Sequence, residues 1–250
     1  MIRRLLLAFS TALAAQGALA ADGVRNVILV HGAFADGSSW SKVVPLLQAK
    51  GYNVTAVQIP LTSFADDVAA TKRALALQKG PVILVGHSWA GVVITEAGVD
   101  PKVAGLVYVA AFAPDLNEQV GELGKKFAPP PALAAPIADA QGFLSLSPEA
   151  FVKQFAWDLP AAEARVLAAA QGPINASAFE AKVSSVAWKS KPSWFIVAKQ
   201  DRAIDPEEER FFAKRANGTV TELNTSHVPM LSKPREVAAV IMNAAAKAAP

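Results

Sequence analysis

One serine stands where the chain could expose a nucleophile. Ser88 lies within residues 85–91, which read VGHSWAG, between an apolar run that predicts a strand and a segment with helical spacing. A nucleophile elbow occupies this kind of strand-to-helix turn. The last position of the G-x-S-x-G pattern holds Ala90. We expect its methyl group to be tolerated, with Gly91 behind it restoring part of the flexibility.

A serine hydroxyl becomes an effective nucleophile when a base removes its proton. The chain offers three histidines, His31, His87 and His227. His31 follows the first predicted strand, and His87 projects away from its neighbour Ser88. His227 follows the last predicted strand, so elimination makes it the general base. Activity should then rise with pH as the imidazole becomes neutral.

The imidazole needs an acid that fixes its orientation and stabilises its protonated form. Asp201 directly follows a predicted strand, and the order Ser88, Asp201, His227 is the order of an α/β-hydrolase triad. Asp205 and Asp115 are the alternatives, but Asp205 is better placed to cap the following helix. Asp201 is therefore the predicted acid.

An oxyanion also needs preorganised N–H donors. The backbone N–H of Trp89 follows the candidate nucleophile at a helix N-terminus, where the helix dipole favours negative charge. The second donor should come from the loop after the first strand, most simply from Ala33. Gly32 would let that loop approach closely.

The elements that must position these residues alternate between short apolar runs and helical spacing. The pattern predicts an α/β fold with a doubly wound, mostly parallel sheet and an inserted helical cap. Strands are predicted at 27–30, 54–59, 82–85, 103–110, 193–198 and 219–223, and helices at 41–50, 63–78, 89–98, 206–215 and 235–246.

The alternation stops at about residues 114–192, where prolines divide short helical stretches. We interpret this segment as a cap inserted into a single domain that spans residues 21–250. The alternative is a helical excursion with no gating role. Aromatic residues that could line a pocket or pack the cap are Phe143, Phe151, Phe155, Trp157, Phe179 and Trp188.

Residues 1–20 have the basic start, apolar run and small-residue end of a secretory signal peptide, which predicts a periplasmic or secreted protein. An anchor helix is the alternative, but the apolar run is short for one. Removing Arg3 and Arg4 lowers the net charge from +3 to +1, so we expect no nucleic-acid partner. The chain has no cysteine. Because no metal-ligand cluster is visible, we expect no metal and no cofactor.

Together, residues 31–40, 86–91, 107–114 and 226–227 resemble the α/β-hydrolase superfamily. Within it, the chain is similar to small bacterial carboxylesterases close to plant hydroxynitrile lyases and methyl-ester esterases. The resemblance implies ester hydrolysis without a cofactor, in a pocket between the sheet edge and the cap.

The leading hypothesis is hydrolysis of small, largely apolar carboxylic esters through an acyl-enzyme on Ser88. One alternative is a cyanohydrin lyase that uses the same three residues as acid and base. A lyase would need a positive charge near the pocket, and the segment 114–192 offers Lys125, Lys126, Lys153 and Lys182. The other alternative is a ligand-binding protein that keeps the fold without turnover.

Overall fold

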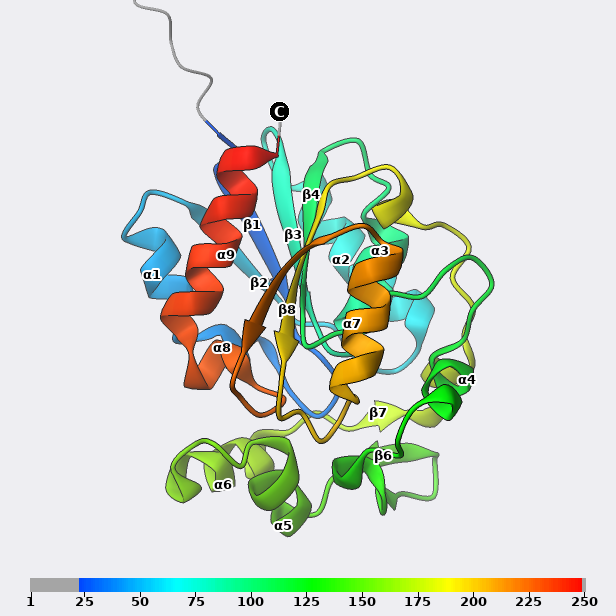
Figure 1. The fold of residues 1–250 in the computed structure, drawn as a ribbon. Helices are drawn as coiled ribbons and strands as arrows, with labels where there is room; N and C mark the ends of the chain where they lie inside the picture. Colours follow the sequence, from blue (N-terminus) through cyan, green and yellow to red (C-terminus); the bar gives the residue numbers. More distant parts are fainter. Residues whose placement is uncertain (1–22, 249–250) are drawn as a thin grey trace, which may run out of the picture.

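The structure is a computed structural model that describes residues 23–248, so the predicted signal segment lies outside the described residues. Six strands form the main sheet, and every neighbouring pair is parallel (Figure 1). The predicted fold class is confirmed. The strands, in order across the sheet, are β2 (Asn53–Val57), β1 (Asn26–Val30), β3 (Val82–His87), β4 (Val103–Val109), β8 (Ser193–Ala198) and β9 (Thr219–Leu223).

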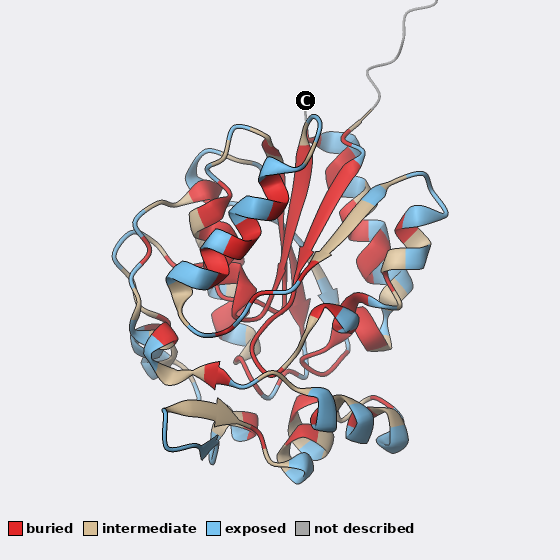
Figure 2. Cartoon of the chain, turned by 180° about the vertical axis from the view of Figure 1, so that it is seen from behind, coloured by how far each residue is buried: buried red, intermediate tan, exposed pale blue. Residues whose placement is uncertain are grey.

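Burial of the strands follows their sequences. Every residue of β1, β3 and β8 is buried, as expected for continuous apolar runs covered on both faces (Figure 2). The edge strands β2 and β9 alternate with polar residues and are partly exposed. The centre of the sheet therefore provides a rigid platform for the loops that follow its strands.

Helices cover both faces of the sheet. Figure 1 shows α1 (Val44–Gln48) and α9 (Pro234–Lys247) on one face, with α2 (Phe64–Ala76) and α3 (Ala90–Ala97) behind the sheet. The helix α7 (Pro206–Arg215) packs on β8, and the short helix α8 (Pro229–Ser232) precedes α9. Ser63 caps α2 by accepting a hydrogen bond from the Asp66 N–H, as its position predicts.

The second strand and the first helix are among the predicted elements that are shorter in the structure. β2 ends at Val57 because the next two residues bond to the loop beyond β1: Ile59 N–H donates to His31, and Gln58 accepts from Gly37 N–H. The helix predicted over residues 41–50 is reduced to α1 and follows a 3-10 turn (Gly37–Trp40).

The segment between β4 and β8 lies across the end of the sheet toward which the strands point (Figure 1). Its short helices include α4 (Val120–Leu123), α5 (Pro148–Ala150), a π-helical turn (Phe151–Phe155) and α6 (Ala161–Ala170). It also contains 3-10 turns at Gly124–Lys126, Pro131–Leu133, Ala176–Glu180 and Ala187–Lys189. A small antiparallel sheet of β5 (Ile137–Ala138), β6 (Phe143–Ser145) and β7 (Ile174–Asn175) was not predicted. The division of the chain into one domain with a cap stays a prediction.

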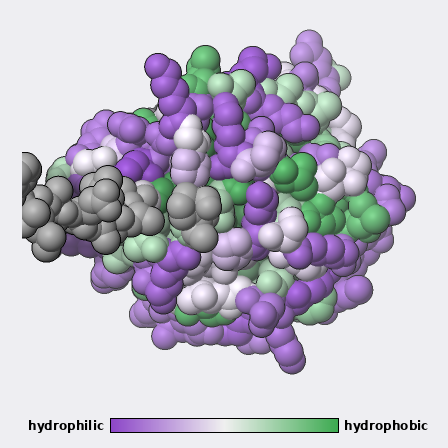
Figure 3. Space-filling view, turned by 90° about the horizontal axis from the view of Figure 1, so that it is seen from above, coloured by the Kyte–Doolittle hydropathy of each residue, from purple (hydrophilic) through white to green (hydrophobic). Residues whose placement is uncertain are grey.

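Figure 3 views the opposite end of the molecule. Seen from above, this face is mainly hydrophilic, with apolar residues in smaller groups (Figure 3). No helix within residues 23–248 is long and apolar enough to cross a membrane. In an open parallel sheet, ligands bind at the carboxyl edge of the strands, which here lies beneath the segment that joins β4 to β8.

Candidate active site

Ser88 occupies the turn between β3 and α3 with a φ of 53°, in the left-handed region that residues with a side chain rarely adopt. Hydrogen bonds hold this turn in place. Ser88 N–H donates to Val109 O at 3.2 Å, and Ser88 O accepts from the N–H groups of Gly91 at 2.9 Å and Phe112 at 3.3 Å. The backbone strain lies at the candidate nucleophile, where strained residues often serve function.

The residues that follow Ser88 explain how the turn tolerates its departure from the usual pattern. Ala90 is fully buried and its methyl group is accommodated. A side chain on Gly91, in contrast, would place its Cβ 2.0 Å from the carbonyl oxygen of Phe112. Gly91 has no positive φ, so the turn does not need a left-handed glycine there. A glycine is required at this position because α3 and the loop after β4 approach each other closely there.

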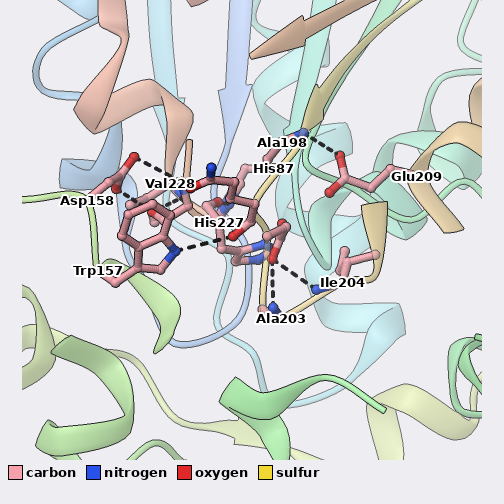
Figure 4. Close-up of polar contacts among 12 residues, drawn as sticks. His87, Trp157, Asp158, Ala198, Ala203, Ile204, Glu209, His227 and Val228 are labelled. Carbon is pink, nitrogen blue, oxygen red and sulfur yellow. Dashed lines mark hydrogen bonds and ion pairs between the residues drawn. The ribbon is translucent and has the colours of Figure 1, made fainter. Parts of the chain in front are cut away.

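His227 and Asp201 meet directly. His227 Nδ1 hydrogen-bonds to Asp201 Oδ2 at 2.5 Å, and Asp201 Oδ1 accepts from the backbone N–H groups of Ala203 at 2.6 Å and Ile204 at 3.1 Å (Figure 4). His227 Nε2 makes no hydrogen bond to any described residue, and His227 lines the same cavity as Ser88. The structure therefore brings the predicted nucleophile, base and acid to one site.

The other two histidines are held by backbone groups. His31 Nε2 accepts from Ile59 N–H at 3.1 Å, and His87 Nε2 lies 2.8 Å from His227 O, to which it donates (Figure 4). Burial lowers the pKa of both side chains, so both are neutral. The sequence assigned no role to His87, yet its bond to His227 O supports the segment that carries the candidate base.

The two alternative acids have other partners. Asp205 caps α7 by accepting from Glu207 N–H at 2.8 Å, as predicted. Asp115 forms an ion pair with Lys189. Only Asp201 of the three contacts His227 among the described residues.

Glu209 on α7 lies beside Asp201, and the sequence did not reveal this neighbour. Glu209 Oε2 accepts a hydrogen bond from Ala198 N–H at 2.9 Å, and its carboxyl lies within hydrogen-bonding range of the Asp201 carboxyl. Burial, followed by the charge of Asp201, raises the pKa of Glu209 well above its ordinary value. The raised pKa favours the protonated form of Glu209, which places less negative charge beside Asp201.

Two backbone N–H groups are available where an oxyanion hole was predicted. Ala33 and Trp89 both line the cavity, and neither backbone N–H donates a hydrogen bond within the part of the chain that the structure describes. The loop that carries Ala33 packs tightly on the nucleophile turn, since a Cβ on Gly32 would lie 2.7 Å from Ser88 Cβ. This loop therefore approaches the nucleophile turn as closely as predicted.

The indole of Trp89 is fixed by a buried carboxyl that the sequence analysis missed. Asp67 on α2 accepts from Trp89 Nε1 at 2.8 Å and from Leu61 N–H at 2.8 Å. Burial is the main cause that raises the pKa of Asp67 to about 6. The Trp89 ring also packs edge-on against Phe64 and Phe179, with centroids 6.1 and 5.3 Å away. The residue expected to donate to the oxyanion is thus held on several sides.

The segment between β4 and β8 contacts the loops that carry Asp201 and His227. Phe155 packs edge-on against His227 with ring centroids 4.7 Å apart. Asp158 accepts from Ser226 N–H at 2.9 Å and from Ser226 Oγ at 2.5 Å (Figure 4). Trp157 Nε1 donates to Gln200 O at 3.2 Å. These contacts fix residues 200 and 226, each adjacent to a predicted triad residue.

A cavity of about 610 Å³ opens beside Ser88. Of the aromatic residues considered as pocket walls, Phe155 and Phe179 line it, whereas the indole N–H of Trp188 donates to Pro114 O. The lining residues are Ala33, Phe34, Ser88, Trp89, Phe112, Val120, Gly121, Gly124, Lys125, Phe127, Pro129, Pro130, Leu133, Phe155, Phe179, Ala203, Glu208 and His227. This largely apolar wall fits a ligand with an apolar body.

Of the four lysines considered for cyanide stabilisation, Lys125 lines this cavity, and its ammonium pairs with Glu122 at 2.7 Å. Lys153 pairs with Glu149 at 2.7 Å, and Lys126 and Lys182 line a separate surface pocket. Within residues 23–248, no group of three or more His, Cys, Asp or Glu side chains is placed to hold a metal ion. The lyase alternative stays a hypothesis.

A serine, an aspartate and a histidine that follow β3, β8 and β9 at one edge of a parallel sheet define the class of α/β hydrolases. Residues 27–240 match the family model described as the alpha/beta hydrolase family. The chain belongs to this family, and the expected family membership is confirmed.

Relatives with established names are also similar over most of the chain. Methylesterase 1 of Arabidopsis thaliana is 29% identical over 89% of this chain and 97% of that protein. A pyrethroid hydrolase of Sphingobium wenxiniae is 28% identical over 87% of this chain and 86% of that protein.

Solved structures superpose over a similar extent. A pyrethroid hydrolase from Sphingobium faniae has a TM-score of 0.76 and 25% identity, covering 89% of this chain and 97% of that one. A polyneuridine aldehyde esterase has a TM-score of 0.76 and 21% identity, covering 88% and 98%, which supports the fold alone.

Proposed function

We propose that this protein hydrolyses small, largely apolar carboxylic esters through an acyl-enzyme on Ser88. The observation that carries the proposal is the arrangement of His227. Its Nδ1 is bonded to Asp201 at 2.5 Å, while its Nε2 has no partner among the described residues and borders the cavity that Ser88 lines. That nitrogen is free to accept the Ser88 proton when a substrate enters.

In the first half of the reaction, Ser88 Oγ attacks the ester carbonyl carbon while His227 Nε2 takes its proton. The backbone N–H groups of Ala33 and Trp89 stabilise the negative oxygen of the tetrahedral intermediate. His227 then gives the proton to the leaving alcohol, the C–O bond breaks, and the acyl group remains on Ser88. Asp201 stabilises the imidazolium throughout.

In the second half, a water molecule attacks the acyl carbon and His227 accepts its proton. The intermediate collapses, the proton returns to Ser88 Oγ, and the carboxylic acid leaves. Each proton that His227 accepts is returned, so this chain's own residues and water complete the reaction.

General ester hydrolysis agrees with the names of the relatives, which include methylesterases, an esterase and a pyrethroid hydrolase. The preference for apolar substrates is supported by the cavity itself. Apart from Ser88 and His227, most of its wall is made of aromatic, proline and aliphatic residues. An apolar acyl or alcohol group gains free energy when it leaves water for such a wall.

The test is hydrolysis of p-nitrophenyl acetate and p-nitrophenyl butyrate by the wild type and by Ser88→Ala. We expect kcat of the variant to fall by roughly 10³-fold or more, because residual turnover relies on the oxyanion donors and binding alone. Ser190→Ala, which truncates an exposed serine, is the matched control and should match the wild type. An inactive wild type, or a Ser88→Ala variant with unchanged activity, would refute the proposal.

A further inference from the structure

Glu208 is a carboxyl group in the wall of the cavity that Ser88 and His227 line. It lies in the first turn of α7, and only 4% of the residue is exposed. Its Oε1 is enclosed and forms no hydrogen bond with any residue that the structure describes. A buried polar atom without a partner lowers stability, so its presence needs a physical reason.

The stability of α7 does not supply that reason. Three glutamates follow one another in its first turns and differ in their partners. Glu207 is exposed and pairs with Arg210 at 2.6 Å, and Glu209 bonds to Ala198 N–H at 2.9 Å. Asp205 and Glu207 already complement the positive end of the helix. Glu209 Oε1 also has no partner among the described residues, but of the three glutamates Glu208 is the one that lines the cavity.

The rest of the cavity wall does not neutralise Glu208. Lys125, the one lysine or arginine among the lining residues, pairs with Glu122 at 2.7 Å. Burial, followed by the charge of Asp205, raises the pKa of Glu208 to about 7. Near neutral pH the carboxyl therefore exists in both forms, and either form can accept a hydrogen bond from a ligand.

We propose that Glu208 determines substrate specificity by receiving the hydroxyl or ammonium group of an ester whose body packs against the apolar wall. The inference rests on the proposed function, because the ester carbonyl must reach Ser88 while the donor group reaches Glu208. An alkyl group at the same place leaves Glu208 unpartnered, and a carboxylate is repelled by it. A cavity of about 610 Å³ accommodates a ligand that spans both groups.

The experiment uses matched esters that differ at one end. p-Nitrophenyl hexanoate is compared with its ω-hydroxy, ω-ammonio and ω-carboxy analogues, and hexyl acetate with ω-hydroxyhexyl acetate. The first set places the donor on the acyl side and the second on the alcohol side, and homologues one or two carbons shorter or longer adjust the reach. The measured quantity is kcat/KM at pH 8, where Glu208 is mainly ionised.

In the wild type we expect at least one donor-bearing ester to exceed its alkyl counterpart by about ten-fold, with the ω-carboxy ester the slowest, because a site that hydrogen-bonds a substrate group discriminates against its absence. Glu208→Leu should reverse the order and favour the alkyl ester. Glu208→Gln should keep the preference for hydroxyl and lose about ten-fold on the ammonium ester, since it accepts a hydrogen bond without charge. Glu207→Gln, one residue earlier and exposed, is the matched control.

The outcomes separate this inference from the proposed function. If the wild type hydrolyses the alkyl and donor-bearing esters equally well at every chain length, or if Glu208→Gln leaves every ratio unchanged, Glu208 does not select the substrate, while Ser88-dependent hydrolysis still stands. If no ester is hydrolysed, or if Ser88→Ala is as active as the wild type, the proposed function itself fails. Because Glu208→Gln is nearly isosteric, the wild type and this variant decide the question even if Glu208→Leu does not fold.

Discussion

At the scale of single residues, the site depends on carboxyl groups with different partners. Asp201 accepts backbone N–H groups on one oxygen and His227 on the other. Its neighbour Glu209 is buried, and its pKa is raised well above the ordinary value. The raised pKa favours the protonated form of Glu209, which repels the Asp201 carboxyl less than a charged neighbour would. Glu209 is not among the residues that line the cavity, so it acts on the site through Asp201.

This arrangement predicts that Glu209 is a positioning residue. Glu209→Leu removes the carboxyl that interacts with Asp201 and leaves Ala198 N–H unpaired, so we expect kcat to fall by roughly ten-fold and the acid limb of the pH–rate profile to move to higher pH. Glu209→Gln keeps both a donor and an acceptor and should restore both values. If Glu209→Leu loses stability but its pH–rate profile is unchanged, the residue serves packing alone.

Ser88, Asp201 and His227 could be predicted from the sequence because each follows a strand of one parallel sheet, and such strands end at a common edge. Asp67 and Glu208 could not, because their roles depend on which face of a helix meets which neighbour. For Asp67 one signal was present. It shares a helical face with Thr71 and Leu75, four and eight residues later, and such a face is buried.

At the scale of elements, the segment between β4 and β8 does more than cover the cavity. Its π-helical turn (Phe151–Phe155) brings Phe155 against His227, and the next residues bond to the two loops that carry the predicted acid and base. A loop after a strand is held at one end by the sheet. Here contacts from the segment between β4 and β8 hold each of the two loops at a second point, which restricts the conformations of the side chains that the loops carry.

Asp158 accepts two of these hydrogen bonds, both from Ser226, and gives a prediction. Asp158→Ala frees Ser226 N–H and Oγ, so the adjacent His227 becomes less well oriented, and kcat should fall by about three- to thirty-fold with a smaller change in KM. Glu149→Gln, which breaks an exposed pair with Lys153 in the same segment, is the control and should leave kcat unchanged. Equal kinetics of Asp158→Ala and the control would show that this attachment does not orient the histidine.

The elements themselves were predictable where the sequence has one regular period. Buried strands such as β3 and β8 are continuous apolar runs, and α7 begins at the predicted cap, Asp205. The end of β2 was misplaced because Ile59 remains apolar and buried after it leaves the sheet to bond His31. The small sheet of β5, β6 and β7 was missed because its strands are two or three residues long, too short for a period to appear.

At the scale of the whole molecule, the fold contains several carboxyl groups that are easier to protonate than in the unfolded chain. Burial raises the pKa of Asp67 from 3.8 to about 6 and that of Glu208 from 4.5 to about 7. The folded state therefore binds more protons than the unfolded state between these values. The stability that these two carboxyl groups contribute is fully present below about pH 4 and is lost as the pH rises through 6 and 7.

Glu208→Leu should remove the part of this pH-dependent loss of stability that Glu208 causes. The variant places an apolar side chain in an apolar wall, so its melting temperature should exceed that of the wild type. The gain should be greater at pH 8, where it corresponds to about 1–3 kcal/mol, than at pH 5, where Glu208 is already protonated.

Thermal unfolding of the wild type, Glu208→Leu and Glu207→Gln at both pH values provides the measurement, and the exposed control should show no such difference. A gain of equal size at pH 5 and pH 8 would mean that the pKa of Glu208 is the same in the folded and the unfolded protein. A gain confined to high pH, together with the loss of activity on donor-bearing esters, would mean that this carboxyl lowers the stability of the fold at the place where it binds substrate.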